Sequence, residues 1–229
     1  MSLDCASCPV RERAACAALS DEERAALARA GRTRVLKRGE TLFAAGDEND
    51  ACATLIEGAL KVTSTDEEGT EYILALVHPA GFVGELFQPF SHHDVVALTD
   101  SRLCVFARSE IEDALQRYPA LAQALLRRSQ EDLHESRRFM TLSNRRGASE
   151  KVAALLLELA HAASHSPCHP TSRFDLPLTR GEIASLLGLT IETVSRSLTA
   201  LEDDGLIRRK GARGIELADP ARLGEKVLV

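Results

Sequence analysis

The sequence is poor in the features that mark membrane and secreted proteins. Aromatic residues make up 4% of its 229 positions, and no apolar run approaches the roughly 18 residues that span a bilayer. Asp4 and Arg11 stand where a secretory signal would be apolar. We therefore expect a cytoplasmic protein that has no membrane partner.

Catalytic motifs are missing as well. The chain has no P-loop, no HExxH motif, and no Ser-His-Asp or paired-carboxylate constellation, so we expect a protein that is not an enzyme. Its formal net charge of -6 excludes a chain that is basic throughout, but DNA affinity depends on local Lys and Arg rather than on the total. The length and the ordinary share of hydrophobic residues, 45%, predict two compact domains.

Cysteine is the residue type that needs an explanation. There are six, and three of them cluster at the start of the chain in CASCPVRERAAC: Cys5, Cys8, Cys16, Cys52, Cys104 and Cys168. Because the cytosol opposes structural disulfides, reduced thiols or metal ligands are favoured, and the N-terminal trio points to a metal centre. We interpret Cys52 as a core thiol and Cys168 as an exposed thiol.

The first half of the chain changes pattern twice. Ser20 and Glu23 form a capping-box pattern that predicts a short helix ending at Gly31. From 32 to 108, short apolar runs broken by glycines predict an antiparallel β sandwich or roll. From 109 to 143 the pattern is helical, interrupted early by Pro119, and the segment after it would be about 37 Å long.

This long helix carries an apolar stripe that one small domain cannot cover. We expect it to pair with its twin in a homodimer; the alternative is a helix packed on its own β domain. A polar, glycine-containing hinge is expected at 144–149, followed by an apolar helix, a loop and a short strand in FDLPL. The predicted domains are a cysteine segment 1–18, a β-roll 19–108, a dimerisation helix 109–146 and a DNA-binding domain 147–229.

The last domain contains a helix-turn-helix pattern. Thr179 and Glu182 form a capping box, Gly188 allows a tight turn, and Thr190 caps a second helix that runs from Ile191 to about 204. One face of that helix is apolar, whereas the opposite face carries Glu192, Ser195, Arg196 and Thr199.

The polar face has the groups that read base edges. Arginine forms bidentate hydrogen bonds with the guanine edge, and glutamate accepts a hydrogen bond from cytosine. Serine and threonine can donate to or accept from either kind of base edge. The next segment, LIRRKGARGIEL, predicts a β hairpin whose basic residues contact phosphates: Arg208, Arg209, Lys210 and Arg213. A solvated helix face is the alternative, but the order of capped helix, turn, split faces and basic wing favours binding to double-stranded DNA.

The whole chain resembles the CRP/FNR family of bacterial transcription regulators. The resemblance implies an α+β fold with a cyclic-nucleotide-binding-type β-roll (double-stranded β-helix or jelly roll), a long dimerisation helix, a C-terminal winged helix-turn-helix, and RNA polymerase as a partner. Within the family, ETVSR at 192–196 resembles the E-x-x-S-R motif of the FNR branch. That likeness implies that Glu192, Ser195 and Arg196 read a palindromic TTGAT-type site.

The same resemblance bears on the ligand. Gly84 and Glu85 match the nucleotide-binding Gly-Glu pair, but the later stretch SHHDVVALTD has no arginine and places Asp94 where a phosphate would be repelled. Arg102 comes several residues too late to substitute. Cyclic nucleotide is therefore an unfavoured ligand, and Gly84 and Glu85 are interpreted as structural.

The FNR branch holds a [4Fe-4S] cluster on three N-terminal cysteines and one remote cysteine. Cys5, Cys8 and Cys16 resemble the trio, and Cys104 resembles the remote ligand. By resemblance, loss of the cluster in oxygen would weaken dimerisation and DNA binding, and nitric oxide is a possible second signal. Ser136 stands where the branch often has an acidic residue that keeps the cluster-free protein monomeric; Glu131, Asp132 and Glu135 are the nearby replacements.

Three alternatives stay open at this point. Zinc takes the same four thiolates, and His92 or His93 could replace Cys104. A thiol redox switch needs no metal at all. A small-molecule effector in the β-roll, with structural zinc on the cysteines, is the third.

Overall fold

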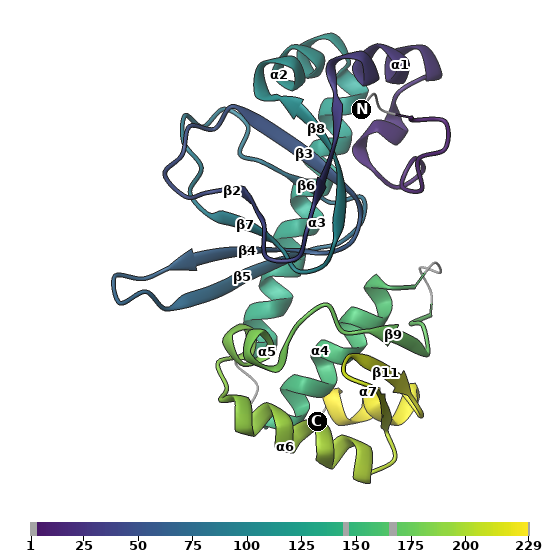
Figure 1. Cartoon of the computed structure of the whole chain (residues 1–229). Helices are drawn as coiled ribbons and strands as arrows, with labels where there is room; N and C mark the ends of the chain where they lie inside the picture. Colours follow the sequence, from purple (N-terminus) through teal and green to yellow (C-terminus); the bar gives the residue numbers. More distant parts are fainter. Residues whose placement is uncertain (1–3, 144–146, 165–168, 229) are drawn as a thin grey trace. The chain divides into compact units, whose positions relative to one another are not determined.

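The computed structural model describes residues 4–143, 147–164 and 169–228, and the chain forms two compact units, Met1–Ser136 and Arg137–Val229. The division lies within the long helix α3 (Pro119–Ser143). The reason is packing, because Leu121 and Leu125, in the first part of α3, are buried within the first unit. Figure 1 shows the order of the elements along the chain.

The first unit contains a β-roll of two four-stranded antiparallel sheets. One sheet has the order β1-β8-β3-β6 and the other β2-β7-β4-β5. The strands are β1 (Arg32–Leu36), β2 (Thr41–Phe43), β3 (Ala51–Glu57), β4 (Leu60–Thr65), β5 (Glu71–Val77), β6 (Phe82–Val83), β7 (Asp94–Ala97) and β8 (Ser101–Ala107). The roll expected at 32–108 and the α+β fold are confirmed.

Alternation along the strands separates a core face from an outer face. On β8, Leu103 and Val105 are 0% and 1% exposed and pack into the core between the sheets. Successive side chains of a strand point to opposite faces, so Arg102, Cys104 and Phe106 share the outer face. That outer face carries the candidate site described below.

Helices cover this outer face. A short 3-10 helix, η1 (Ala15–Ala18), precedes α1 (Asp21–Ala30), whose capping box joins Ser20 and Glu23 as predicted. The helical stretch after the roll divides into α2 (Arg108–Arg117) and α3. The break falls before Pro119, as the sequence predicts, because the residue before a proline is disfavoured in helical geometry.

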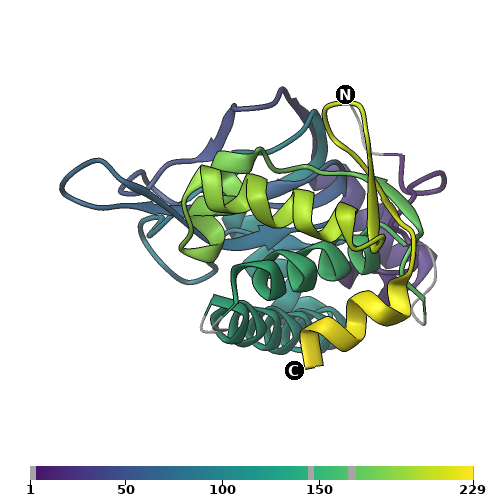
Figure 2. The same ribbon diagram turned by 90° about the horizontal axis from the view of Figure 1, so that it is seen from below.

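The second unit is a winged helix-turn-helix. Its elements are α4 (Ala148–Ala162), β9 (Arg173–Asp175), α5 (Arg180–Leu187), α6 (Ile191–Asp203), β10 (Ile207–Lys210), β11 (Gly214–Leu217) and α7 (Pro220–Leu228). The strands form a sheet in the order β10-β11-β9. The apolar helix α4 packs against α6 and α7, and Figure 2 shows these helices from below, with α7 in yellow.

Two sequence expectations need comment. The strand expected in FDLPL is shorter and ends at Asp175, because Pro177 has no N–H for the ladder. The hinge at 144–149 lies partly on 144–146, outside the described residues, and α4 begins at Ala148. Within the described part of the chain, no helix combines the length and apolarity needed to cross a membrane.

Candidate functional site

Four cysteines surround one cavity in the first unit. Cys5 and Cys8 come from the irregular N-terminal segment, Cys16 from η1, and Cys104 from β8. All four line a cavity of about 260 Å³. The structure thus brings together the four residues that the sequence nominated, although one is remote from the other three.

The sheet, α1 and the start of α3 build the walls of this cavity. Cys104 is paired in register with Thr33 of β1 and Thr54 of β3, and both threonines line the cavity. The opposite walls are apolar and come from three helices: Leu27 of α1, Ile111 of α2, and Leu121 and Leu125 of α3. The long helix therefore contacts the same space as the thiols.

The cavity favours neutral thiols when nothing is bound. Burial raises the pKa of Cys5, Cys16 and Cys104, and the neighbouring thiols raise it further. A metal binds the thiolate form, so occupation of the site requires the release of protons. These thiols therefore ionise to thiolates only when a bound cation compensates their negative charge.

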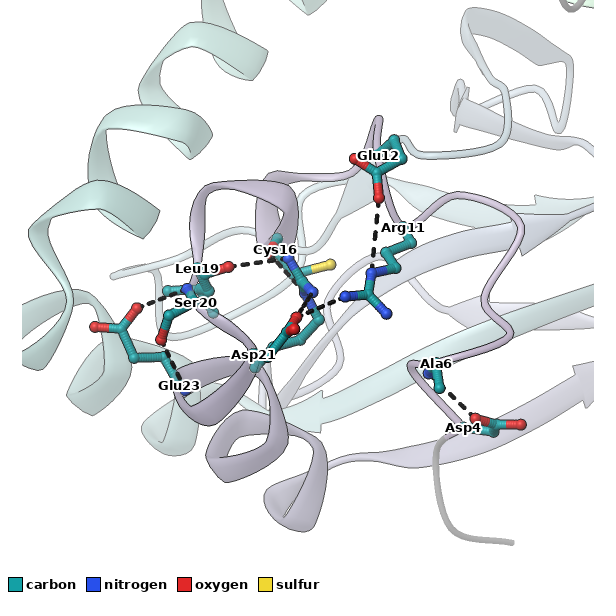
Figure 3. A network of polar contacts seen from close by, with 10 residues as sticks. Asp4, Ala6, Arg11, Glu12, Cys16, Leu19, Ser20, Asp21 and Glu23 are labelled. Atoms are coloured by element: carbon teal, nitrogen blue, oxygen red, sulfur yellow. Dashed lines mark hydrogen bonds and ion pairs between the residues drawn. The ribbon is translucent and has the colours of Figure 1, made fainter.

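A buried arginine lies beside the thiols. The side chain of Arg24 is 9% exposed, and its guanidinium donates to the carbonyl oxygens of Cys16 (3.1 Å) and Leu19 (2.9 Å) and to Asp21 Oδ1 (2.8 Å). Figure 3 shows this network around Cys16. Arg24 was not predicted as a site residue; its position three residues before Leu27, on the buried side of α1, was the available signal.

The four thiols are candidate ligands of a metal centre. Tetrahedral zinc with bonds of about 2.3 Å would hold its sulfurs roughly 4 Å apart. Among the described residues, no group of three or more His, Cys, Asp or Glu side chains is placed to hold a single metal ion. The four thiols share a cavity of about 260 Å³ with the other lining residues.

The histidine alternative to Cys104 is wrong. The His92 ring contacts the Glu85 carboxylate, and His93 Nδ1 lies 3.6 Å from Glu85 Oε1. Neither histidine is among the described residues that line the cysteine cavity. The sequence suggested them because they are metal-ligating residues before β8, but the β6–β7 connection carries them to Glu85.

Cys52 is a core thiol, as expected. It is 1% exposed, and burial raises its pKa to about 12. It lies on β3 beside β8 but does not line the cavity. Cys168 lies outside the described residues.

Gly84, Glu85 and Asp94 each have close neighbours or hydrogen-bond partners within the β-roll. Gly84 has φ +118°, and a Cβ there would meet the Cys52 Cβ at 2.7 Å. Glu85 accepts from the His92 backbone N–H at 3.0 Å, and Asp94 accepts from the Ala45 N–H at 2.9 Å. These contacts agree with a structural role for Gly84 and Glu85.

The helix-turn-helix has the geometry expected from its sequence. Gly188 has φ 61° and ends α5, and the Thr190 hydroxyl accepts from the Thr193 N–H at 3.2 Å to cap α6. The inward residues Val194, Leu198 and Leu201 are at most 2% exposed. The turn therefore fixes α6 by its apolar face and leaves the other face outward.

The outward face of α6 presents charged and hydroxyl groups. Glu192, Arg196 and Thr199 are exposed, and Ser195 is half-buried. The backbone N–H of Glu192 and the Thr190 hydroxyl lower the pKa of Glu192, so this side chain is an acceptor at neutral pH. Arg180, which the sequence analysis did not single out, donates to Ser195 Oγ at 3.5 Å from the start of α5.

The wing residues fall into two groups. Arg208 and Lys210 are exposed and Arg213 is half-buried. Arg209 is held by Glu202 of α6, whose carboxylate accepts from its backbone N–H and from Nε, both at 2.7 Å. Arg209 therefore ties the hairpin to the recognition helix, and its guanidinium is the least available of the set.

Comparisons with known proteins agree with this architecture. A Crp-like helix-turn-helix domain matches residues 150–226, and a cyclic nucleotide-binding domain matches 33–118. The chain is 38% identical to the transcriptional activator protein FnrL of Cereibacter sphaeroides over 97% of this chain and 91% of that protein. It is 36% identical to a probable transcriptional activator of Rhizobium leguminosarum bv. viciae, over 94% and 89%.

A solved structure gives the same result at the level of the fold. The structure of FixK2 from Bradyrhizobium japonicum superposes with a TM-score of 0.77 at 26% identity, covering 85% of this chain and 96% of that one. Two matched domains in the right order and relatives of nearly full length leave one conclusion. The chain belongs to the CRP/FNR family of DNA-binding transcription regulators, which are not enzymes.

Proposed function

We propose that this chain is an oxygen-responsive transcription activator that carries a [4Fe-4S] cluster on Cys5, Cys8, Cys16 and Cys104. The observation that carries the proposal is the convergence of these four thiols on one cavity whose wall includes the start of α3. Four thiolates are the complete ligand set of a cubane cluster. The four thiols that line the cavity support such a group, and zinc on the same thiols is the alternative that the metal analysis below distinguishes.

When bound, the cluster supplies an inorganic centre that oxygen can destroy. The protein's part is to connect that centre to α3. Leu121 and Leu125 line the cavity, and the same helix carries the exposed side chains of Leu126, Leu133 and Met140. Loss of the cluster would remove contacts that hold the start of α3 at the cavity. The exposed apolar side chains farther along α3 would then be less firmly positioned.

Leu126, Leu133 and Met140 are exposed large apolar residues of α3 spaced seven apart, which places them on one stripe of the helix. We propose that this stripe pairs with its copy in a homodimer. The acidic residues near Ser136 are partly neutralised, because Arg128 lies 3.1 Å from Asp132 and 3.6 Å from Glu131. These ion pairs would weaken the repulsion between the acidic residues of two facing α3 helices. The cluster-free protein would therefore retain part of its tendency to dimerise.

Each protomer would then supply one recognition helix to a palindromic TTGAT-type site. Glu192, Ser195 and Arg196 would contact bases, with Thr190, Thr199 and Arg180 beside them. Arg208, Lys210 and Arg213 would contact phosphates, and Arg209 would act mainly through Glu202. The names of the two relatives include the word activator, which favours contact with RNA polymerase at the promoter.

Anaerobic purification tests the proposal. We expect a coloured protein with equal amounts of iron and acid-labile sulfide, bound to a TTGAT palindrome, that loses colour and operator affinity in air. Light scattering before and after air exposure measures the dimer. A colourless protein with stoichiometric zinc would support a structural zinc site. A metal-free protein that responds to oxidants would support a thiol switch. Either result would overturn the proposal of a cluster.

A further inference from the structure

Three arginines line the cysteine cavity, and their surroundings differ. The side chains of Arg11 and Arg102 are 30% and 43% exposed, and Arg102 pairs with Glu57 at 2.5 Å. The side chain of Arg24 is 9% exposed. A buried guanidinium needs fixed partners, because an uncompensated buried charge is strongly unfavourable.

The partners of Arg24 belong to the segment that carries the ligands. Its Nε donates to the backbone oxygen of Cys16 at 3.1 Å, and its Nη2 donates to that of Leu19 at 2.9 Å. Leu19 is 4% exposed, so its carbonyl lies where water has little access. The planar fork of arginine thus holds both ends of the turn that presents the Cys16 side chain.

The network continues from Cys16 to Cys8. Asp21 Oδ1 accepts from Arg24 Nη1 at 2.8 Å and from Arg11 Nη2 at 2.6 Å. The backbone N–H of Arg11 in turn donates to the Cys8 carbonyl at 3.1 Å. One carboxylate at the first turn of α1 therefore links the backbones of two candidate ligands, as Figure 3 shows in part.

We propose that Arg24 is the positioning residue of the cysteine site, holding the Cys8–Cys16 segment over the cavity and keeping a positive charge beside the thiolates. The proposal rests on the proposed function, because the group to be held is a four-thiolate cluster. Such a cluster carries net negative charge, and neighbouring charge sets its reduction potential. Arg24 lines the same cavity as Cys5 and Cys16, so its positive charge lies at the site of the thiols.

Hydrogen exchange on the cluster-free full-length protein tests the positioning role. Arg24→Gln and Arg24→Lys both lose the fork, and we expect amides in 4–19 to exchange roughly tenfold faster or more, as the loss of charged hydrogen bonds predicts. Arg29→Gln is the matched control, since Arg29 lies on the exposed side of the same helix, and it should leave exchange unchanged. Wild-type exchange rates in Arg24→Gln would overturn the proposal.

The loaded protein tests the charge. Arg24→Lys keeps the positive charge and Arg24→Gln removes it, so the reduction potential of the cluster should be lower in the glutamine variant. Equal potentials in the two variants would count against the proposal. If the wild type takes up no iron, the proposed function fails, and the exchange experiment alone decides whether Arg24 positions the segment.

Discussion

The cysteine cavity and the DNA-reading face are opposite kinds of site. The cavity is lined by apolar side chains together with three arginines, and burial raises the pKa of Cys5, Cys16 and Cys104. The face of α6 is open, and hydrogen bonds lower the pKa of Glu192. The thiols of the cavity favour the neutral form until a cation binds, whereas the acidic and basic side chains of α6 are charged without a partner.

Under the proposed function, regulation is located at the cavity and not at the face of α6. The outward groups of α6 are fixed by the local turn and by the apolar contacts of Val194 and Leu198, so this face needs no signal to form. The thiols belong to separate elements whose arrangement a bound group would stabilise. We infer that the signal changes the pairing of two reading faces and leaves the shape of each unchanged.

The largest expected effect is the loss of the remote ligand. Cys104→Ala should reduce iron and sulfide in the anaerobically purified protein to near background, because three thiolates leave the cubane incomplete. Metal and sulfide analysis measures it. Cys52→Ala is the matched control: this buried thiol lies on the neighbouring strand and does not line the cavity. Full cluster content in Cys104→Ala would remove Cys104 from the ligand set.

A smaller effect is expected on the DNA face. Arg196→Ala should weaken binding to the intact operator by about 1–3 kcal/mol, roughly 5- to 150-fold, and leave binding to unrelated DNA nearly unchanged. Lys210→Ala should weaken binding to both DNAs alike, because a phosphate contact carries no sequence information. Fluorescence anisotropy at fixed salt measures both. If Arg196→Ala weakened binding to both DNAs equally, Arg196 would contact the DNA backbone and not the bases.

The smallest effect concerns the stability of the unit that holds the cavity. Burial and the nearby Arg128 lower the pKa of His78 to about 4 from 6.5. The unfolded state therefore binds more protons between these values, and stability falls as the pH is lowered from 6.5 toward 4. At pH 5 the loss should be about 1–2 kcal/mol relative to pH 7.

Urea denaturation of cluster-free protein at the two pH values measures this effect of His78. His78→Gln should reduce the difference between pH 7 and pH 5, whereas His134→Gln, at an exposed position of α3, should not. An unchanged difference in His78→Gln would assign the acid sensitivity to other groups.

Much of the molecule could be predicted because its signals are local. The capping boxes at Ser20 and Thr179, the turn at Gly188 and the split faces of α6 each depend on residues within a few positions. The strand predicted in FDLPL was too long, because β9 ends at Asp175 and Pro177 has no N–H with which to continue the hydrogen-bonded ladder. Arg180 and Arg24 were missed because an arginine on a helix is expected at the surface, although the position of Arg24 three residues before Leu27 places it on the buried side of α1.

The sequence by itself determined the order of elements, the identity of the reading face and the presence of four suitable thiols, since all of these depend on residue type and short-range spacing. Only the tertiary structure decided that Cys104 faces the N-terminal trio, that His92 and His93 go to Glu85, and that Arg24 is buried against Cys16. The physical reason is that a strand alternates its faces. Which face of β8 meets the N-terminal segment is fixed by the packing of the whole roll.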